Sequence, residues 1–340
     1  MERARLTPVL REEATARTCI VSSFATELLE IRSKEPSLHV VLIPGNPGIV
    51  AFYKDFVEAL YENLGGQASI TAIGHISHSQ KDAECGRLFS LREQIDHKVD
   101  FIEKELLHSE ESIVLMNVYK IQKTDAFESF LNITLPDYLT EHINFRADIV
   151  GHSIGAYIGL EIFKRLPNKV TVPIFNIEQE FCKAIGNCIY CKKSSLLSKG
   201  VSSFASFIGS LQYSVTRGIV RRFLGPSWSV TAIDAACRHL LRYHTMRNVL
   251  FMAKTEFQKL TEEPDWTFIR AKQDEIALLF GVGDHWGPIS HLEEVSKRAP
   301  RVALSVETEG HTHGYCCTEA GSFWVADYVA NLIIKRTNDN

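Results

Sequence analysis

Ser153 lies in the pentapeptide Gly-His-Ser-Ile-Gly at residues 151–155, which has the Gly-x-Ser-x-Gly spacing of a nucleophile elbow. A short apolar run enters this motif and an apolar-periodic segment leaves it, as expected for a sharp turn from a strand into a helix. The glycines at both ends leave room where a Cβ would collide with the neighbouring elements. The turn would present the Ser153 hydroxyl at a helix N-terminus, where the backbone N–H of Ile154 can face a developing oxyanion.

A catalytic serine also needs a base, and the base needs an acid that orients it. Asp284 follows one apolar run, and His311 and His313 follow the next one. These residues occur in the order Ser, Asp, His, each in a loop after a strand, which is the order of α/β-hydrolases. His311 and His313 both remain candidates for the base at this point. His152 is expected to point away from the base position and to serve either as a support for the catalytic residues or as a packing residue.

The turn Pro-Gly-Asn-Pro-Gly at residues 44–48 follows an earlier apolar run and supplies the remaining part of such a site. The second oxyanion N–H is expected from Asn46, because Pro47 has none. Each feature also has a structural explanation: Asp284 could cap a turn, the histidines could lie on the surface, and residues 44–48 could be a tight turn. Four such features at strand ends in one order favour the catalytic interpretation.

The elements that must position these residues alternate along the chain. Apolar runs predict strands, and helical spacing or a capping box predicts helices. The expected strands are 18–31, 39–43, 69–76, 113–118, 143–149, 169–175, 276–280 and 302–306. The expected helices are 52–64, 90–106, one after Ser153, and 322–335. This alternation predicts an α/β-hydrolase fold with a mostly parallel sheet flanked by helices.

Two stretches interrupt the alternation and define the expected domains. Residues 176–270 contain helical patterns and no clear strand, so they are expected to form a helical cap inserted before the acid-bearing strand. The core is then expected to be 1–175 and 271–340, with an insertion at 119–145. Amphipathic residues of the cap suit a lipophilic substrate or a lipid surface, and equally a face packed on the sheet: Phe204, Phe207, Ile208, Leu211, Ile219 and Phe223.

Composition excludes several classes of function. The 340 residues are 45% apolar and 23% charged, with a net charge of −4, which gives no reason to expect nucleic acid. No run approaches the roughly 18 apolar residues of a membrane span, and residues 1–13 lack the apolar core of a signal peptide. Eight irregularly spaced cysteines fit reduced thiols in the cytosol. The pair Cys188 and Cys191 is a lone CxxC and a weak metal signal, so no metal or cofactor is expected.

The chain resembles the lipid droplet-associated hydrolase family, an α/β-hydrolase group. The similarity lies in residues 43–48 with Phe52-Tyr53, 94–98, 151–155 with Tyr157, 283–286, and the late His-Gly-Tyr at 313–315. The resemblance implies nucleophile Ser153, acid Asp284 and base His313, the last because a small residue and an aromatic residue follow it. It also implies association with lipid droplets or the endoplasmic reticulum, and an esterase or lipase-like activity on neutral lipids or sterol esters.

The chain departs from the family pattern at 119–145 and 176–200. The competing interpretations are a lipid-droplet or membrane-surface protein with an inert centre, and a thioesterase or peptidase on the same scaffold. The sequence makes no prediction of oligomeric state.

Overall fold

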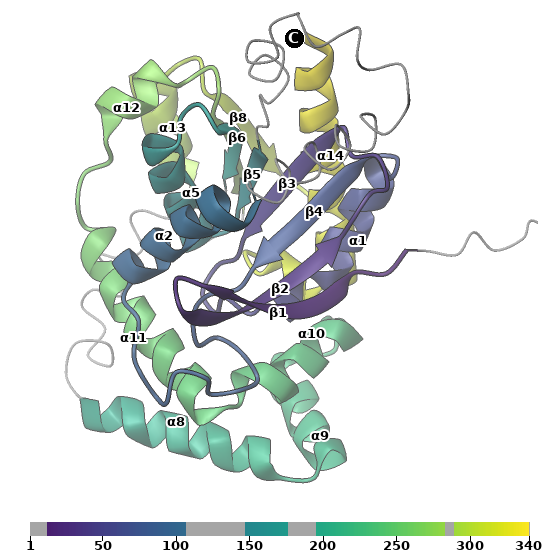
Figure 1. Ribbon diagram of the computed structural model, residues 1–340, viewed down its shortest axis with the longest axis vertical. Coiled ribbons are helices and arrows are strands. Elements are labelled where there is room, and N and C mark those ends of the chain that lie inside the picture. The colour runs from purple at the N-terminus through teal and green to yellow at the C-terminus, as the bar shows by residue number, and fades with distance from the viewer. Residues whose placement is uncertain (1–11, 107–146, 176–194, 283–288, 340) are drawn as a thin grey trace, which may run out of the picture.

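The computed structural model describes residues 12–106, 147–175, 195–282 and 289–339, which fold around an eight-stranded sheet (Figure 1). The order across the sheet is β1-β2-β4-β3-β5-β6-β7-β8. The strands are β1 (Thr15–Val21), β2 (Phe24–Ile31), β3 (Leu38–Ile43), β4 (Ala68–Ile73), β5 (Ala147–Gly151), β6 (Val170–Phe175), β7 (Ala277–Gly281) and β8 (Ala303–Glu307). β2 is antiparallel to β1 and β4, and the pairs from β4 through β8 are parallel.

β3 shows why the central strands are continuously apolar. Val40 and Leu42 belong to the cluster that includes α1 (Lys54–Asn63) and α14 (Glu319–Asp339). Val41 and Ile43 belong to the cluster on the opposite face of the sheet. All four side chains are fully buried, because helices cover both faces of a parallel sheet and leave no face for polar residues.

The second face is covered by α2 (Leu91–Asp100), α5 (Ile154–Arg165), α12 (Trp266–Ala271) and α13 (Ile289–Arg298). The capping box predicted at the start of α2 is present. The Glu93 N–H donates to the Ser90 hydroxyl, and the Ser90 N–H donates to the Glu93 carboxylate. A π-helical turn, Phe101–Leu106, continues α2.

A group of helices lies between β6 and β7 in the chain. They are α8 (Ser195–Ser210), α9 (Tyr213–Leu224), α10 (Val230–Ala235), a π-helical turn (Ala236–Leu240) and α11 (Tyr243–Lys259), followed by α12. Figure 1 shows α8, α9, α10 and α11 together beyond one end of the sheet. α11 is hydrogen-bonded to the loops that follow β3 and β4, so this group covers the C-terminal ends of those strands, as a cap does.

Most predicted elements are confirmed within the described ranges, but residues 18–31 belong to two strands rather than one. β1 and β2 form a hairpin closed by Ser22 and Ser23, whose φ values of 50° and 71° suit a two-residue turn. The strand predicted at 113–118, the insertion at 119–145 and the pair Cys188 and Cys191 lie outside the described residues. In the described ranges, no helix is both long enough and apolar enough to cross a bilayer.

Candidate active site

Ser153 lies at the sharp turn between β5 and α5, as its motif predicts. Its φ of 58° and ψ of −129° are values that residues with a side chain rarely adopt. The turn depends on close approach at both glycines. A Cβ at Gly155 would lie 2.2 Å from the carbonyl oxygen of Ile43, and one at Gly151 would lie 2.6 Å from the Cα of Ala156. Strain of this kind, held by its surroundings, is typical of a functional position.

The turn after β3 lies directly beside Ser153. A Cβ at Gly45 would lie 3.0 Å from the Cβ of Ser153. Among the described residues, the backbone N–H groups of Asn46 and Ile154 have no hydrogen-bond acceptor. Two N–H donors next to a serine are what stabilisation of a tetrahedral oxyanion requires.

A chain of hydrogen bonds joins this turn to the elbow and to the late loop. The Gly45 N–H donates to the Tyr53 hydroxyl at 2.9 Å, and that hydroxyl lies 2.6 Å from Nδ1 of His152. Nε2 of His152 lies 2.8 Å from the carbonyl oxygen of His313. A carbonyl can only accept, so Nε2 carries the proton, and Nδ1 of the neutral ring accepts from Tyr53. We call this series of hydrogen bonds, from Gly45 through Tyr53 and His152 to His313, the Tyr53–His152 relay.

The relay holds the loop after β8 against the elbow. The His313 ring lies against the His152 ring with centroids 5.1 Å apart, and the Tyr315 ring meets His152 edge-on at 4.7 Å. The Ser153 hydroxyl and the His313 ring form no hydrogen bond in the described part of the chain. Catalytic hydrogen bonds are often long before substrate binds, so this geometry is compatible with a base at His313.

His311 has different surroundings. Its ring lies 6.0 Å from that of Trp324, and its Nε2 is 3.8 Å from the Glu309 carboxylate. Its backbone N–H donates to Glu307 at the end of β8. Of the two histidines, His313 is therefore the one that lies against the elbow.

The expected acid, Asp284, lies outside the described residues, in the gap between β7 and α13. β7 ends at Gly281, which pairs with Glu307 at the end of the parallel strand β8. The loop that carries Asp284 thus begins beside the strand that leads to His313.

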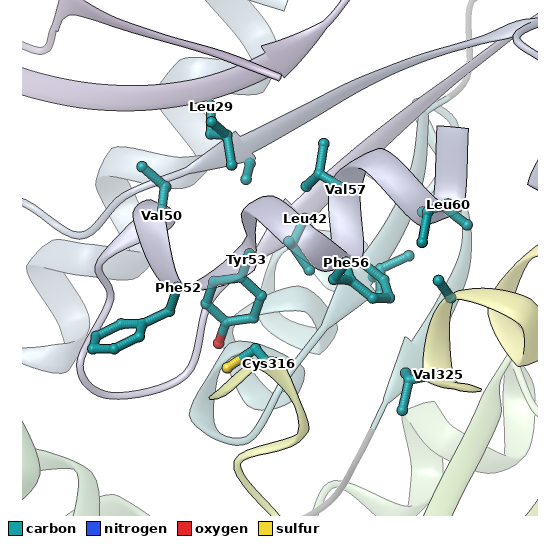
Figure 2. Packing of buried hydrophobic residues seen from close by; sticks show 14 of the residues in the cluster. Leu29, Leu42, Val50, Phe52, Tyr53, Phe56, Val57, Leu60, Cys316 and Val325 are labelled. Carbon is teal, nitrogen blue, oxygen red and sulfur yellow. The ribbon is translucent and has the colours of Figure 1, made fainter. Parts of the chain in front are cut away.

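Burial shifts the pKa of two groups around the elbow and the adjoining turn. Tyr53 is 1% exposed, and burial raises the pKa of its hydroxyl well above its usual value. Figure 2 shows Tyr53 among apolar side chains, with its hydroxyl toward the segment of Cys316. On the far side of the turn, the Gly48 N–H donates to Nδ1 of His78. Burial, assisted by the charge of Lys98, lowers the pKa of His78 to about 3.

Asn46 also connects the turn to the cap. Its side-chain amide donates to the carbonyl of Val249 at 3.1 Å and to the Glu256 carboxylate at 3.3 Å, both on α11. A second contact joins the His244 ring of α11 to the Ser79 carbonyl at 2.9 Å. The side chain of Asn46 thus anchors the cap to the turn that lies beside Ser153.

The relay was not expected from the sequence. The expectation that His152 points away from the base is wrong, because its ring lies against His313 and contacts Tyr53 and Tyr315. The Phe-Tyr pair after the turn was visible as part of the family resemblance. Nothing in its spacing, however, pairs Tyr53 with a histidine 99 positions later.

Solved structures of α/β-hydrolases match the fold. A haloalkane dehalogenase from Bradyrhizobium elkani superposes with a TM-score of 0.63 at 14% identity, covering 96% of this chain and 100% of that one. An epoxide hydrolase from Vigna radiata gives 0.59 at 12% identity, with coverage of 96% and 99%. At such identities the likeness concerns the fold alone, and it confirms the predicted α/β-hydrolase fold.

Relatives found by sequence identify the family more specifically than the solved structures do. The lipid droplet-associated hydrolase of Dictyostelium discoideum is 26% identical over 327 residues, covering 92% of this chain and 94% of the relative. Those of Gallus gallus and Homo sapiens are each 23% identical, covering 82% and 85% of this chain and 80% and 83% of the relatives. The model of the lipid-droplet associated hydrolase family matches residues 36–118 and 117–316. Since this match spans most of the chain, the protein belongs to the lipid droplet-associated hydrolase family.

Proposed function

We propose that this chain is a serine hydrolase that cleaves carboxylic esters of neutral lipids or sterols. His313 takes the proton of the Ser153 hydroxyl while Asp284 holds the imidazole in the required tautomer. Ser153 attacks the ester carbonyl, the N–H groups of Asn46 and Ile154 hold the oxyanion, and water resolves the acyl-enzyme. The mechanism calls on no metal and no cofactor.

The observation that carries the proposal is the hydrogen bond from His152 to the His313 carbonyl. It joins the residue beside the nucleophile to a loop 161 positions later in the sequence. Leaving a buried donor without its partner would cost about 1–3 kcal/mol, so the bond holds the loop in place. The bond thereby supports the proposal by keeping the His313 loop against the residue next to Ser153.

The names of the relatives support the coarser part of the proposal, a hydrolase that associates with lipid droplets. The surface of α8 supports the association with lipid droplets. Leu196, Phe204 and Phe207 are 78%, 68% and 61% exposed, whereas Ser202 and Ala205 are buried. An ordinary surface helix has the opposite arrangement.

We name the exposed apolar side chains of α8 and α9 the apolar arm: Leu196, Leu197, Val201, Phe204, Phe207, Val215 and Phe223. Phe223 is 85% exposed, and Arg221 and Arg222 beside it are exposed as well. Apolar side chains flanked by arginines suit the boundary between headgroups and acyl chains. We infer that the arm places the chain on the surface of a lipid droplet or of the endoplasmic reticulum.

The test is a panel of esters with varied acyl and alcohol parts, incubated with the wild type and with Ser153→Ala. The proposal expects turnover of lipophilic carboxylic esters that falls by at least about a thousandfold in the variant. Equal turnover by both proteins would remove Ser153 from the mechanism. If the protein prefers thioesters or peptides, the proposed acyl-enzyme mechanism stands, but the substrate is not a carboxylic ester.

A second candidate is a lipid-surface protein whose centre is inert. The apolar arm favours it, because droplet binding through the arm requires nothing of Ser153. It expects droplet association without turnover of any ester in the panel. Measuring both properties on the same preparation separates the two candidates.

A further inference from the structure

The described residues enclose a cavity of about 260 Å³ that has Ser153 in its lining. The α5 side of the cavity is formed by Ser153, Ala156, Leu160 and Lys164, which follow one another at helical spacing on one face. Since α5 rises about 1.5 Å per residue, the distance from Ser153 to Lys164 is about 16 Å. The cavity is therefore elongated along α5, with the nucleophile at one end.

The other walls are mainly apolar, and His291, Lys259, Glu262, Glu263 and Glu294 line the cavity as well. The apolar residues include Leu278 of β7, Trp266 and Ile269 of α12, and Val295 of α13, all of them buried. Apolar cavities exclude water and accept hydrocarbon. Among these walls, an alkyl chain would replace empty space with favourable contacts.

The end away from Ser153 is charged. Lys164 pairs with Glu161 at 3.1 Å and with Asp265 at 3.2 Å, and all three side chains line the cavity and are partly exposed. This cluster lies about 12–16 Å along α5 from the nucleophile. A chain lying along α5 from Ser153 would be buried up to this cluster and would meet charge and water beyond it.

We propose that this cavity binds the acyl chain of the substrate, with the carbonyl at Ser153 and the alkyl chain along α5. The inference rests on the proposed function, because acylation of Ser153 places the carbonyl at the inner end. It adds to that function by assigning the acyl group rather than the alcohol to this space. It also sets an upper limit on the length of the acyl chain that the cavity can bury completely.

The test compares chain-length profiles for nitrophenyl esters from acetate through butyrate, octanoate and laurate to palmitate. In the wild type, kcat/KM rises by roughly fourfold per added methylene until the chain reaches the charged cluster, and then levels off. Leu160→Trp fills the middle of the cavity and Leu160→Ala enlarges it. Ile334→Trp, at an exposed position of α14, is the matched control.

With Leu160→Trp we expect laurate turnover to fall by at least about tenfold while acetate turnover stays within about twofold. With Leu160→Ala the plateau shifts to longer chains, and Ile334→Trp keeps the wild-type profile. A profile unchanged by both Leu160 variants would overturn the assignment. If thermal unfolding shows that Leu160→Trp does not fold, Val295→Phe narrows the same cavity from α13 and takes its place.

A binding measurement separates failure of this inference from failure of the proposed function. Ser153→Ala is titrated with a fluorescent polyunsaturated fatty acid, and so is the double variant with Leu160→Trp. The cavity predicts saturable binding to the first protein and at least about tenfold weaker binding to the second. If the fatty acid binds but the wild type turns over no ester, the assignment of the cavity stands and the proposed hydrolase activity is rejected. Equal binding to both proteins would reject the cavity.

Discussion

The elbow and helix α8 depart from the usual distribution of polarity in opposite directions. At the elbow and the adjoining turn, Tyr53, His152 and His78 are buried, and the Tyr53 hydroxyl, both ring nitrogens of His152 and Nδ1 of His78 make specific hydrogen bonds. On α8, Phe204 and Phe207 are exposed while Ser202 is buried. The elbow directs these polar groups into hydrogen bonds within the protein, whereas the apolar arm exposes its apolar side chains.

The two regions should therefore respond differently to substitution. Removing a group from the elbow leaves buried donors or acceptors without partners, which costs about 1–3 kcal/mol each. Replacing an exposed phenylalanine of the arm should leave the fold nearly unchanged, because surface substitutions usually change stability by about 0.5 kcal/mol or less. Chemistry and lipid binding should be separable by mutation.

The largest effect is expected at the elbow. His313→Ala should lower kcat/KM for esters by about 10³–10⁴-fold, because it removes the proton acceptor and keeps the backbone carbonyl that binds His152. His311→Ala is the matched control and should stay within about threefold. Steady-state kinetics on one soluble ester measures both. A large loss in His311→Ala with none in His313→Ala would exchange their roles.

The next effect concerns the arm. Phe204→Ser combined with Phe207→Ser should weaken partitioning to artificial droplets by about 10²-fold or more, since burial of each phenylalanine contributes about 1.5–3 kcal/mol. Turnover of a soluble ester should not change. Phe323→Ser, at an exposed position of α14, serves as the control. Flotation that is the same for the control and the double variant would place the lipid contact elsewhere.

A pH effect on stability is expected from His78. Its pKa is about 3 in the folded chain and near 6.5 when unfolded, so only the unfolded state takes up the proton as the pH falls below about 6.5. Lowering the pH from 7 to 5 should therefore reduce the free energy of unfolding of both proteins, and by about 2 kcal/mol more in the wild type than in His78→Asn. The Asn side chain retains an acceptor for the Gly48 N–H. Urea unfolding at both pH values measures this difference. Equal losses in both proteins would mean that His78 titrates normally.

The smallest effect is expected from the relay. Tyr53→Phe removes the hydroxyl that links Gly45 to His152, so kcat should fall by about tenfold with KM nearly unchanged. Tyr61→Phe, on the exposed side of α1, is the matched control. Unchanged kcat, or a loss confined to KM, would limit the hydroxyl to a structural role.

Local sequence patterns predicted the fold and the elbow. The contacts between residues far apart in the sequence could not be predicted from such patterns. The apolar run at 39–43 and the glycines around Ser153 act within a few residues, so strand and turn could be predicted. The Tyr53–His152 relay depends on residues that only the folded sheet brings together. The helical period of α8 was visible in Phe204 and Phe207, but periodicity cannot tell a face packed on the protein from one turned to solvent. Ser22 and Ser23 form a turn that usually carries Asn or Gly, so the hairpin of β1 and β2 had no sequence signal.

The most direct test is labelling with a fluorophosphonate probe, followed by mass spectrometry of the labelled peptide. Activation of the serine hydroxyl predicts one adduct on Ser153, strong loss of labelling in His313→Ala, and wild-type labelling in the Phe204→Ser, Phe207→Ser variant. No adduct on Ser153 in folded wild-type protein, or equal labelling of Ser153→Ala, would contradict a nucleophilic serine at the elbow.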